Sequence, residues 1–203
     1  MKKLDLACGN NKKGADWIGV DVSKTSSVDI VHDLNIYPWP FEDNSIDEIY
    51  CSHYIEHIKH DTIHVDLLNA VNQSSNFEEF KEKLNEDSFK RSKDGFIKFM
   101  NEAYRILKPE GKMTIIAPYW SSLRSSGDPT HVRLICDSTA WYLNKEWITN
   151  NKLEHYGIDC NFDCKISYFI TNEMTLKSEE VRNKAFIHDL NVIDDIIIEL
   201  VKK

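Results

Sequence analysis

The sequence has no apolar stretch of about 18 residues, the length that a helix needs to cross a bilayer. We therefore expect no membrane-spanning segment. Two lysines precede an apolar segment at the start, MKKLDLACG, but Asp5 interrupts that segment and leaves it too short for the core of a secretion signal. The five cysteines are odd in number and form no CxxC pair, which favours a reduced, cytoplasmic compartment over a disulfide framework.

An excess of positive charge is also missing. The 203 residues include 25 Lys and Arg against 33 Asp and Glu, a formal net charge of -8. An acidic chain is a poor partner for duplex DNA, structured RNA or an anionic membrane, because these surfaces repel it. Hydrophobic residues make up 41% and charged residues 29%, which is an ordinary composition for one domain with a sizeable core.

Short apolar and β-branched segments predict a sheet. Five strands are expected in residues 2–8, 17–22, 28–34, 45–53 and 112–119. Between the last two, the apolar residues from Phe96 to Leu107 recur at helical spacing, and Pro109 and Gly111 end that helix. Strands that alternate with a crossover helix indicate an α/β fold with a mostly parallel sheet.

The C-terminal part continues the sheet. Residues 137–148 read as a helix and residues 157–170 as a long strand. The last segment, residues 192–203, is ambiguous, but its β-branched run Ile196–Ile198 favours a strand. An antiparallel pair formed by these last two strands would close the sheet.

Residues 58–95 form a predicted helical insertion after the fourth strand. Their apolar residues are too few for a second core, so we expect one domain over residues 1–203. Because the insertion follows a strand end, our first interpretation is a lid that selects the substrate. The alternative is a dimer contact made by Phe77, Phe80, Leu84 and Phe89.

The first turn, Leu4–Ser23, has the pattern of a nucleotide site without its helix. Only twelve positions separate Gly9 from Asp21, whereas a dinucleotide fold needs about twenty for the helix between its first two strands. The turn also lacks the G-x-G-x-x-G pattern that holds a pyrophosphate. An acid in the place of Asp21 accepts from both hydroxyls of a ribose, and Asp33 can accept from the adenine amine. S-adenosylmethionine, an adenosine without phosphates, fits this pattern.

Four segments together carry a family resemblance: LDLACG, the acid of GVDVS, HDLNIYPWPFEDNSIDEIYCSHYIEHI and EAYRILKPEGKMTIIAPY. They resemble the class I S-adenosylmethionine-dependent methyltransferases, and more closely the small type-11-like branch, over residues 3–143 apart from the insertion. The resemblance implies a Rossmann-like sheet of seven strands, mostly parallel, with the last two antiparallel. Two positions depart from it: Ala7 stands where the family usually has its first glycine, and Asn11 where a further glycine is common.

The resemblance also implies a cofactor site. Asp5 and Gly9 would frame the methionine moiety, and Asp21 would bind the ribose. Leu34 would lie with Asp33 at the adenine, and Ser52 with His53 would line the sulfonium side. The predicted cofactor-binding set is Asp5, Ala7, Cys8, Gly9, Asp21, Val22, Asp33, Leu34, Ser52 and His53. Each acid alone also fits a helix cap or a turn, and Cys8 fits a packed apolar position.

Candidate catalytic residues follow the fifth strand, in the loop SSLRSSGDPTHVRLI. Methyl transfer depends mainly on alignment, and it needs a general base only if the acceptor holds its proton. His131 is the predicted base, because an imidazole titrates near neutral pH. Arg133 would orient an acidic acceptor or pair with Asp128. The alternative is structural: Asp128 caps the turn before Pro129, and His131 anchors the loop.

Four histidines offer a competing interpretation. His53, His57, His60 and His64 are spaced by four, three and four residues, and on one helix they would share a face and could chelate a divalent metal. His53, however, falls at a strand end. We therefore assign no metal, and we read these histidines as solvated or capping residues.

The sequence thus predicts an S-adenosylmethionine-dependent methyltransferase with an O or N acceptor. We expect a small molecule or sugar-like metabolite as acceptor, with a protein second. The tetrapeptide APYW lacks the leading Asn or Asp with which amino-methylating DNA enzymes hold a base. The alternatives are a non-catalytic cofactor-binding or regulatory protein of the same fold, and a metal-binding protein that uses the four histidines.

Overall fold

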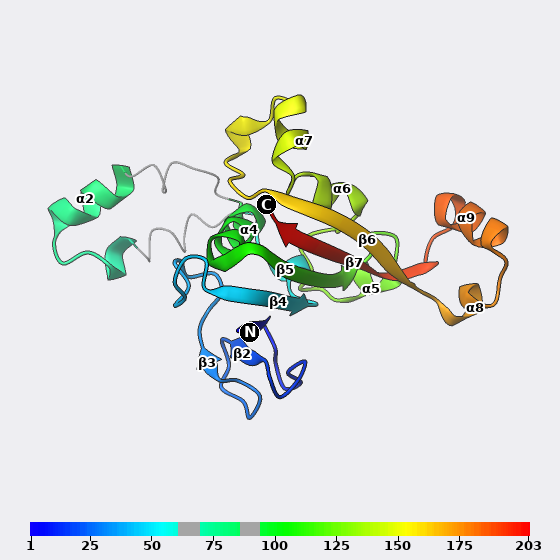
Figure 1. Cartoon of the computed structure of the whole chain (residues 1–203), viewed down its shortest axis with the longest axis horizontal. Coiled ribbons are helices and arrows are strands. Elements are labelled where there is room, and N and C mark those ends of the chain that lie inside the picture. The colour runs from blue at the N-terminus through cyan, green and yellow to red at the C-terminus, as the bar shows by residue number, and fades with distance from the viewer. Residues whose placement is uncertain (61–69, 86–93) are drawn as a thin grey trace.

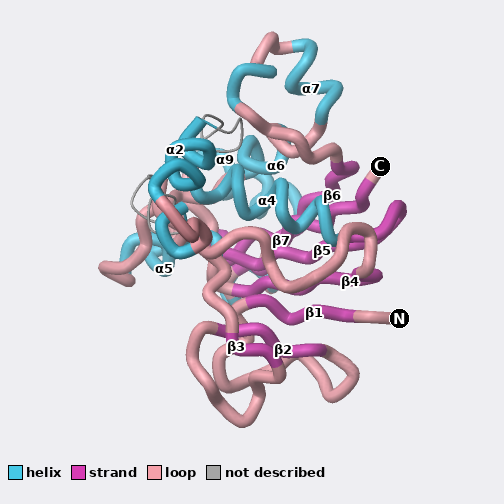
Figure 2. The backbone as a smooth tube through the Cα atoms, turned by 90° about the vertical axis from the view of Figure 1, so that its left-hand side faces the viewer, coloured by secondary structure: helices cyan, strands magenta, loops and turns pink. Residues whose placement is uncertain are grey.

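The computed structural model describes residues 1–60, 70–85 and 94–203, and its centre is one sheet of seven strands (Figure 1). The strands are β1 (Lys3–Leu6), β2 (Ile18–Asp21), β3 (Ile30–Val31), β4 (Ile46–Ser52), β5 (Leu107–Pro118), β6 (Phe162–Ile170) and β7 (Ile193–Lys202). Their order is β3-β2-β1-β4-β5-β7-β6, and Figure 2 shows them stacked from β2 and β3 at one edge to β6 at the other. β7 pairs antiparallel with both β5 and β6, while the first five strands pair in parallel. The predicted fold class is confirmed, including the antiparallel pairing of the last two strands.

The helices surround this sheet. The described ones are η1 (Ile55–His57), α2 (Phe77–Asn85), α4 (Gly95–Ile106), α5 (Leu123–Gly127), α6 (Asp137–Trp141), α7 (Lys145–Asn150), η2 (Glu154–Tyr156), α8 (Asn172–Thr175) and α9 (Glu179–His188). α4 is the predicted crossover helix between β4 and β5. Asp94 caps its start by accepting from the backbone N–H groups of Phe96 and Ile97, at 3.0 and 3.2 Å. Its apolar face, which includes the fully buried Phe99, enters the core.

The connections between the first three strands contain no helix. Residues 7–17 and 22–29 form turns and bends, which confirms the shortened first crossover. The second loop lies directly on β2 at Gly19, where an added Cβ would stand 2.3 Å from the carbonyl oxygen of Ser27. The carboxylate of Asp29 accepts from the Gly19 N–H at 2.8 Å and from Lys12 Nζ at 2.7 Å. Polar contacts of this kind replace helix packing at this edge of the sheet.

The segment Lys108–Gly111 differs from the prediction. We expected it to be a turn between helix and strand, but β5 already begins at Leu107, which pairs with Ile46. The register shifts before the pairing resumes at Lys112, and Glu110 adopts a positive φ of 63°. The turn-forming residues Pro109 and Gly111 therefore make a bulge-like irregularity inside β5 and do not separate a helix from a strand, because the residues on both sides of them pair with β4.

The C-terminal helices also differ in part. The predicted helix 137–148 is two short helices, α6 and α7, because Asn144 starts α7 by accepting from Trp147 N at 3.0 Å. α8 and α9 were not predicted. In α9 the buried residue is Ala185, so the helix lacks the apolar stripe that periodicity detects.

α2 belongs to the predicted insertion and stands apart from the sheet (Figure 1). Phe77, one of the predicted dimer-contact residues, is exposed. Phe89 and the side chain of Leu84 lie outside the described residues. No helix within the described ranges is both long and apolar enough to cross a bilayer.

Candidate functional site

The carboxyl ends of β1 and β2 meet at a turn that Asp21 holds together. Its Oδ2 accepts from the Gly9 N–H at 3.0 Å, and its Oδ1 accepts from the Ser23 N–H at 2.9 Å. Ala7 and Gly9 both adopt positive φ, 56° and 54°. A Cβ added at Gly9 would meet nothing within 4 Å, so the backbone there faces open space. Gly9 and Asp21, both in the predicted cofactor-binding set, are thus in contact, and the half-buried carboxylate keeps further lone pairs for a ligand.

Beneath this turn, Asp5 and Cys8 are buried. Asp5 Oδ2 accepts from the Lys13 N–H at 2.7 Å, while its burial raises the pKa of the carboxyl group. Burial also raises the pKa of the Cys8 thiol to about 11, so the group is a neutral thiol at neutral pH and a poor nucleophile. Cys8 therefore packs beneath the turn, as its apolar interpretation predicts.

At the end of β3, Asp33 organises the next turn. Its Oδ1 accepts from both the backbone N–H and the side-chain amide of Asn35, each at 2.9 Å. Leu34 is buried, and its carbonyl oxygen accepts from Trp39 Nε1 at 3.1 Å. Val22, by contrast, is 63% exposed at the end of β2 and offers an apolar surface. An acid, a buried leucine and an exposed valine are thus available beside the Asp21 turn.

Ser52 ends β4, and His53 leaves the strand with a φ of 53°. The His53 N–H donates to the Ile116 carbonyl at 2.8 Å. Its Nδ1 lies 3.4 Å from Glu56 Oε1, and its Nε2 lies 3.9 Å from Asp195 Oδ2. A hydrogen bond with Glu56 is the main cause that raises the pKa of His53. The imidazole thus stands between two carboxylates.

The histidines do not form a helical stripe in the described chain. His53 belongs to the strand end and His57 to η1. The ring nitrogens of His60 lie 3.3 Å from Asp94 Oδ2 and 3.0 Å from the Val132 carbonyl oxygen. His64 lies outside the described residues.

The loop after β5 places Asp128 in its structural role. Asp128 Oδ1 accepts from both the N–H and the hydroxyl of Thr130, at 2.8 and 2.7 Å. Hydrogen bonds from Thr130 lower the pKa of Asp128. Its Oδ2 lies 3.9 Å from His131 Nε2, so the capping acid also stands beside the predicted base.

Arg133 pairs with an acid that the sequence reasoning did not consider. Its Nη2 contacts both carboxylate oxygens of Asp94 at 3.0 and 2.9 Å, and its guanidinium lies 5.3 Å from the Phe96 ring centroid. This pair joins the loop to the start of α4. The alternative partner that we predicted, Asp128, is occupied by Thr130 instead.

His131 is largely buried, with 9% of its side chain exposed. Its Nδ1 lies 3.0 Å from the Ser125 carbonyl oxygen, and its Nε2 lies 4.0 Å from Glu56 Oε1. The Glu56 carbonyl oxygen accepts from Val132 N and Arg133 N, at 2.9 and 3.2 Å. These backbone bonds bring the loop onto the end of β4.

Two buried acids stand at this place, and sequence reasoning missed Asp195. Glu56 is 1% exposed and Asp195, in β7, is 5% exposed. Asp195 Oδ2 accepts from Arg124 Nη1 at 2.7 Å, and burial raises the pKa of Asp195. Glu56 had a weak signal, an acid flanked by histidines, whereas Asp195 is brought to the site by the pairing of β7 with Pro118 of β5.

Aromatic residues stand beside this loop. Tyr119 and Tyr168 both donate their hydroxyls to the carboxylate of Asp137. Trp120, next to Tyr119, is 47% exposed. Of these two neighbours, Trp120 has the exposed surface that could contact an acceptor, while Tyr119 is held by an internal contact.

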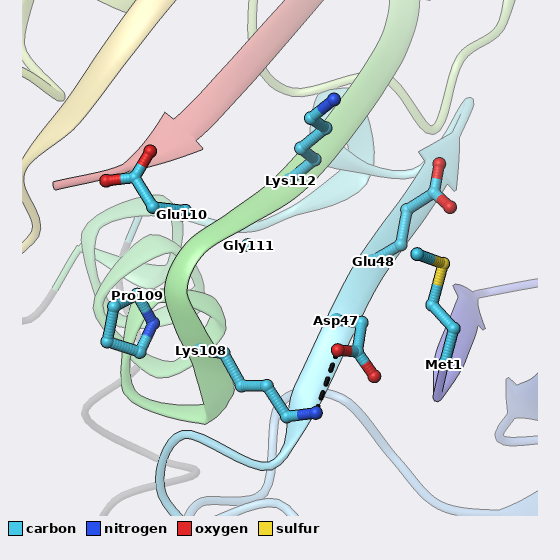
Figure 3. Close-up of a pocket in the computed structure, with 8 residues that line it drawn as sticks. All are labelled: Met1, Asp47, Glu48, Lys108, Pro109, Glu110, Gly111 and Lys112. Atoms are coloured by element: carbon cyan, nitrogen blue, oxygen red, sulfur yellow. Dashed lines mark hydrogen bonds and ion pairs between the residues drawn. The ribbon is translucent and has the colours of Figure 1, made fainter.

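A separate pocket of about 270 Å³ lies at the opposite end of the sheet (Figure 3). It is lined by the start of β4 and the first part of β5, where Lys108 pairs with Asp47 at 2.8 Å. Open α/β sheets bind their ligands at the carboxyl ends of the strands. We therefore do not regard this pocket as the functional site.

Comparison with known proteins supports the fold. No family model matches the chain, and no curated protein matches it. Among solved structures, the chain is similar to an S-adenosylmethionine-dependent methyltransferase from Archaeoglobus fulgidus, with 21% identity, a TM-score of 0.59, and coverage of 99% of this chain and 86% of that one. It is also similar to the YcgJ protein of Bacillus subtilis, with 16% identity, a TM-score of 0.51, and coverage of 100% and 92%. At these identities the similarity establishes the fold alone, which this chain shares with the two structures.

Proposed function

We propose that this protein is an S-adenosylmethionine-dependent methyltransferase. The observation that carries the proposal is the turn at the ends of β1 and β2, where Asp21 holds the Gly9 backbone beside open space and no helix follows. A turn of this kind suits an adenosine that carries no phosphates, because the pyrophosphate of a dinucleotide is typically held at the N-terminus of a helix.

The residues present fit that cofactor. Asp21 has the lone pairs to bind both ribose hydroxyls, and the exposed Val22 and the turn at Asp33 and Leu34 can receive the adenine. The open space at Gly9, above the buried Asp5, suits the methionine part. The bound cofactor supplies an electrophilic methyl group on its sulfonium, and the chain holds the acceptor in line with it.

The acceptor side lies at the loop after β5. His131 is our proposed base, and Asp128 and Arg133 position it. Asp128 stands beside His131 Nε2. Arg133 joins the loop to the start of α4 through Asp94. Ser52 and His53, at the end of β4, lie between the two sides. The net charge of -8 disfavours a nucleic-acid acceptor, and we propose a small molecule or sugar-like metabolite as the O or N acceptor.

The first test is a calorimetric titration of the full chain with S-adenosylhomocysteine, run beside Asp21→Ala and the matched control Asp16→Ala. Asp16 is an exposed acid that pairs with Lys3 at the start of β1, away from the carboxyl ends of the strands. We expect saturable binding that Asp21→Ala weakens by about 10- to 100-fold, the loss expected for hydrogen bonds to a charged group. The control should bind as the parent does. No heat from protein shown by circular dichroism to be folded would refute the proposal.

Turnover separates the enzyme from a non-catalytic protein of the same fold. A panel of hydroxyl and amine acceptors is incubated with labelled cofactor, and the transfer of label is measured. Transfer that His131→Ala lowers in kcat, with cofactor affinity unchanged, supports the proposed base. Cofactor binding without transfer to any class of acceptor favours the regulatory alternative.

A further inference from the structure

Glu56 is a buried carboxylate whose oxygens are unsatisfied. It is 1% exposed, and neither Oε1 nor Oε2 has a hydrogen-bond partner of good geometry among the described residues. An ionised carboxylate that is removed from water without such partners is strongly unfavourable, so buried charges are normally paired or bind a metal. His53 Nδ1 lies 3.4 Å from Oε1 and is the basic neighbour of this carboxylate, but His53 also faces Asp195, so the surroundings of Glu56 allow a further positive partner.

Two histidines stand next to it. Glu56, His57 and His131 each offer one ligand atom, and the three atoms lie within 4.8 Å of one another. In a tetrahedral zinc site neighbouring ligand atoms are about 3.4 Å apart, as the usual zinc–ligand distances require. The ligand atoms would therefore have to move closer together when an ion binds.

The hydrogen bonds fix both imidazoles with Nε2 free. The Thr130 hydroxyl donates its proton to Asp128 Oδ1 at 2.7 Å, so it accepts from His57 Nδ1, which lies 3.0 Å away. The Ser125 carbonyl oxygen can only accept, so His131 Nδ1 donates to it at 3.0 Å. In both rings Nε2 then carries the lone pair. Metal-binding histidines typically show this arrangement, in which the other ring nitrogen donates to an oxygen.

The charge of the cluster also calls for a cation. Glu56, Asp128 and Asp195 supply three carboxylates, whereas Arg124, paired with Asp195 at 2.7 Å, and the His53 imidazole supply the facing basic groups. Acidic groups thus outnumber basic ones, which favours a bound cation.

We propose that Glu56, His57 and His131 bind a divalent transition-metal ion such as Zn²⁺. A site of two histidines and one carboxylate is typical of zinc that keeps an open coordination position. The site differs from the four-histidine stripe, because His60 is occupied by Asp94 and the Val132 carbonyl. Metal binding does not depend on the proposed methyl transfer. If both hold, the ion lowers the pKa of an acceptor hydroxyl and His131 is a ligand instead of the base.

The test is a metal titration of the full chain after treatment with EDTA and removal of the chelator. Zn²⁺ binding is followed by calorimetry, and Co²⁺ binding by its visible absorption. We expect one ion per chain, bound at least about tenfold more weakly by Glu56→Gln, His57→Ala and His131→Ala. His188→Ala, which removes an exposed histidine of α9, should bind as the parent does. Absence of saturable binding, equal binding by the cluster variants, or a thiolate charge-transfer band would each overturn the proposal.

Thermal unfolding provides a second readout that needs no activity. Glu56→Gln should raise the unfolding midpoint of the metal-free protein, because it removes an unsatisfied buried charge. Zn²⁺ should raise the midpoint of the parent by more than it raises that of Glu56→Gln, because the variant binds the ion more weakly. A lower midpoint for metal-free Glu56→Gln would show that the protein itself satisfies the carboxylate, and this would also overturn the proposal. Binding of S-adenosylhomocysteine, measured on the same samples, reports on the proposed function separately.

Discussion

The two sides of the sheet are built differently. β1, β2 and β3 have four, four and two residues, whereas β4, β5, β6 and β7 have seven, twelve, nine and ten. The short strands are joined by loops that side-chain hydrogen bonds hold, such as those of Asp21 and Asp29. The long strands enclose, with α4, most of the buried apolar residues.

This difference in strand length and connection suggests that the short-strand side serves ligand binding and the long-strand side serves stability. Loops that lie close to strand ends expose backbone N–H groups and carboxylates to a ligand, which a packed helix would cover. The long strands form a scaffold whose apolar core stabilises the fold although two acids, Glu56 and Asp195, are buried beneath the loop after β5. Substitutions on the scaffold should therefore affect stability most, and substitutions in the loops should affect binding more than stability.

The largest stability effect is expected from Phe99→Ala on the scaffold side. Phe99 is fully buried, and its ring centroid lies 5.1 Å from that of Trp39 and 5.6 Å from that of Tyr54. Removal of a buried phenyl ring leaves a cavity and should lower the free energy of unfolding by about 3–5 kcal/mol in urea denaturation. Phe77→Ala, at an exposed position of α2, is the control and should change it by less than about 0.5 kcal/mol. Equal losses in both variants would contradict the assignment of the core.

Gly19→Ala tests the loop side. Its new Cβ would lie 2.3 Å from the Ser27 carbonyl oxygen and 2.8 Å from Cys8 Sγ, so the loop must move off β2. We expect a loss of about 1–3 kcal/mol in unfolding free energy, the usual cost of overpacking, together with weaker binding of S-adenosylhomocysteine.

The matched control for this change is Gly127→Ala, where an added Cβ meets nothing within 4 Å. It should leave binding unchanged and alter stability by less than about 1 kcal/mol. If Gly19→Ala lowers stability and leaves binding intact, the loop is not part of the ligand site.

The smallest effect should come from the buried carboxyl group beneath the first turn. Because burial raises the folded-state pKa of Asp5 above its unfolded value of 3.8, the folded protein holds this proton more tightly. The stability contribution of Asp5 is therefore present below that value and is lost as pH rises through the folded pKa. In the parent, the loss of this contribution lowers the thermal unfolding midpoint as pH rises. Asp5→Asn should abolish that part of the pH dependence in a series of midpoints measured at increasing pH.

Asp16→Asn provides a control of opposite sign. The hydrogen bond from Lys3 lowers the pKa of Asp16, so its contribution is present above the unfolded value and is lost as pH falls. An identical pH dependence in the two variants would mean that neither group behaves as its surroundings indicate.

Local patterns in the sequence were enough to predict much of the fold. Short apolar and β-branched segments located the strands, and helical spacing located α4. The irregular start of β5 escaped prediction, because Lys108–Gly111 has the composition of a turn and joins the sheet through its pairing with β4. α6 and α7 were merged, since their separation depends on the cap at Asn144.

The candidate site shows the same division. The sequence by itself determined the Asp21 turn, because Gly9 and Asp21 are joined by a short local connection whose length excludes a helix. Tertiary structure decided which groups surround His131. Glu56, His131 and Asp195 come from η1, a distant loop and the last strand, and they meet because β4, β5 and β7 are neighbours in the sheet. Neighbouring strands are chosen by burial of the whole apolar core, and that choice is not written in any single segment of the chain.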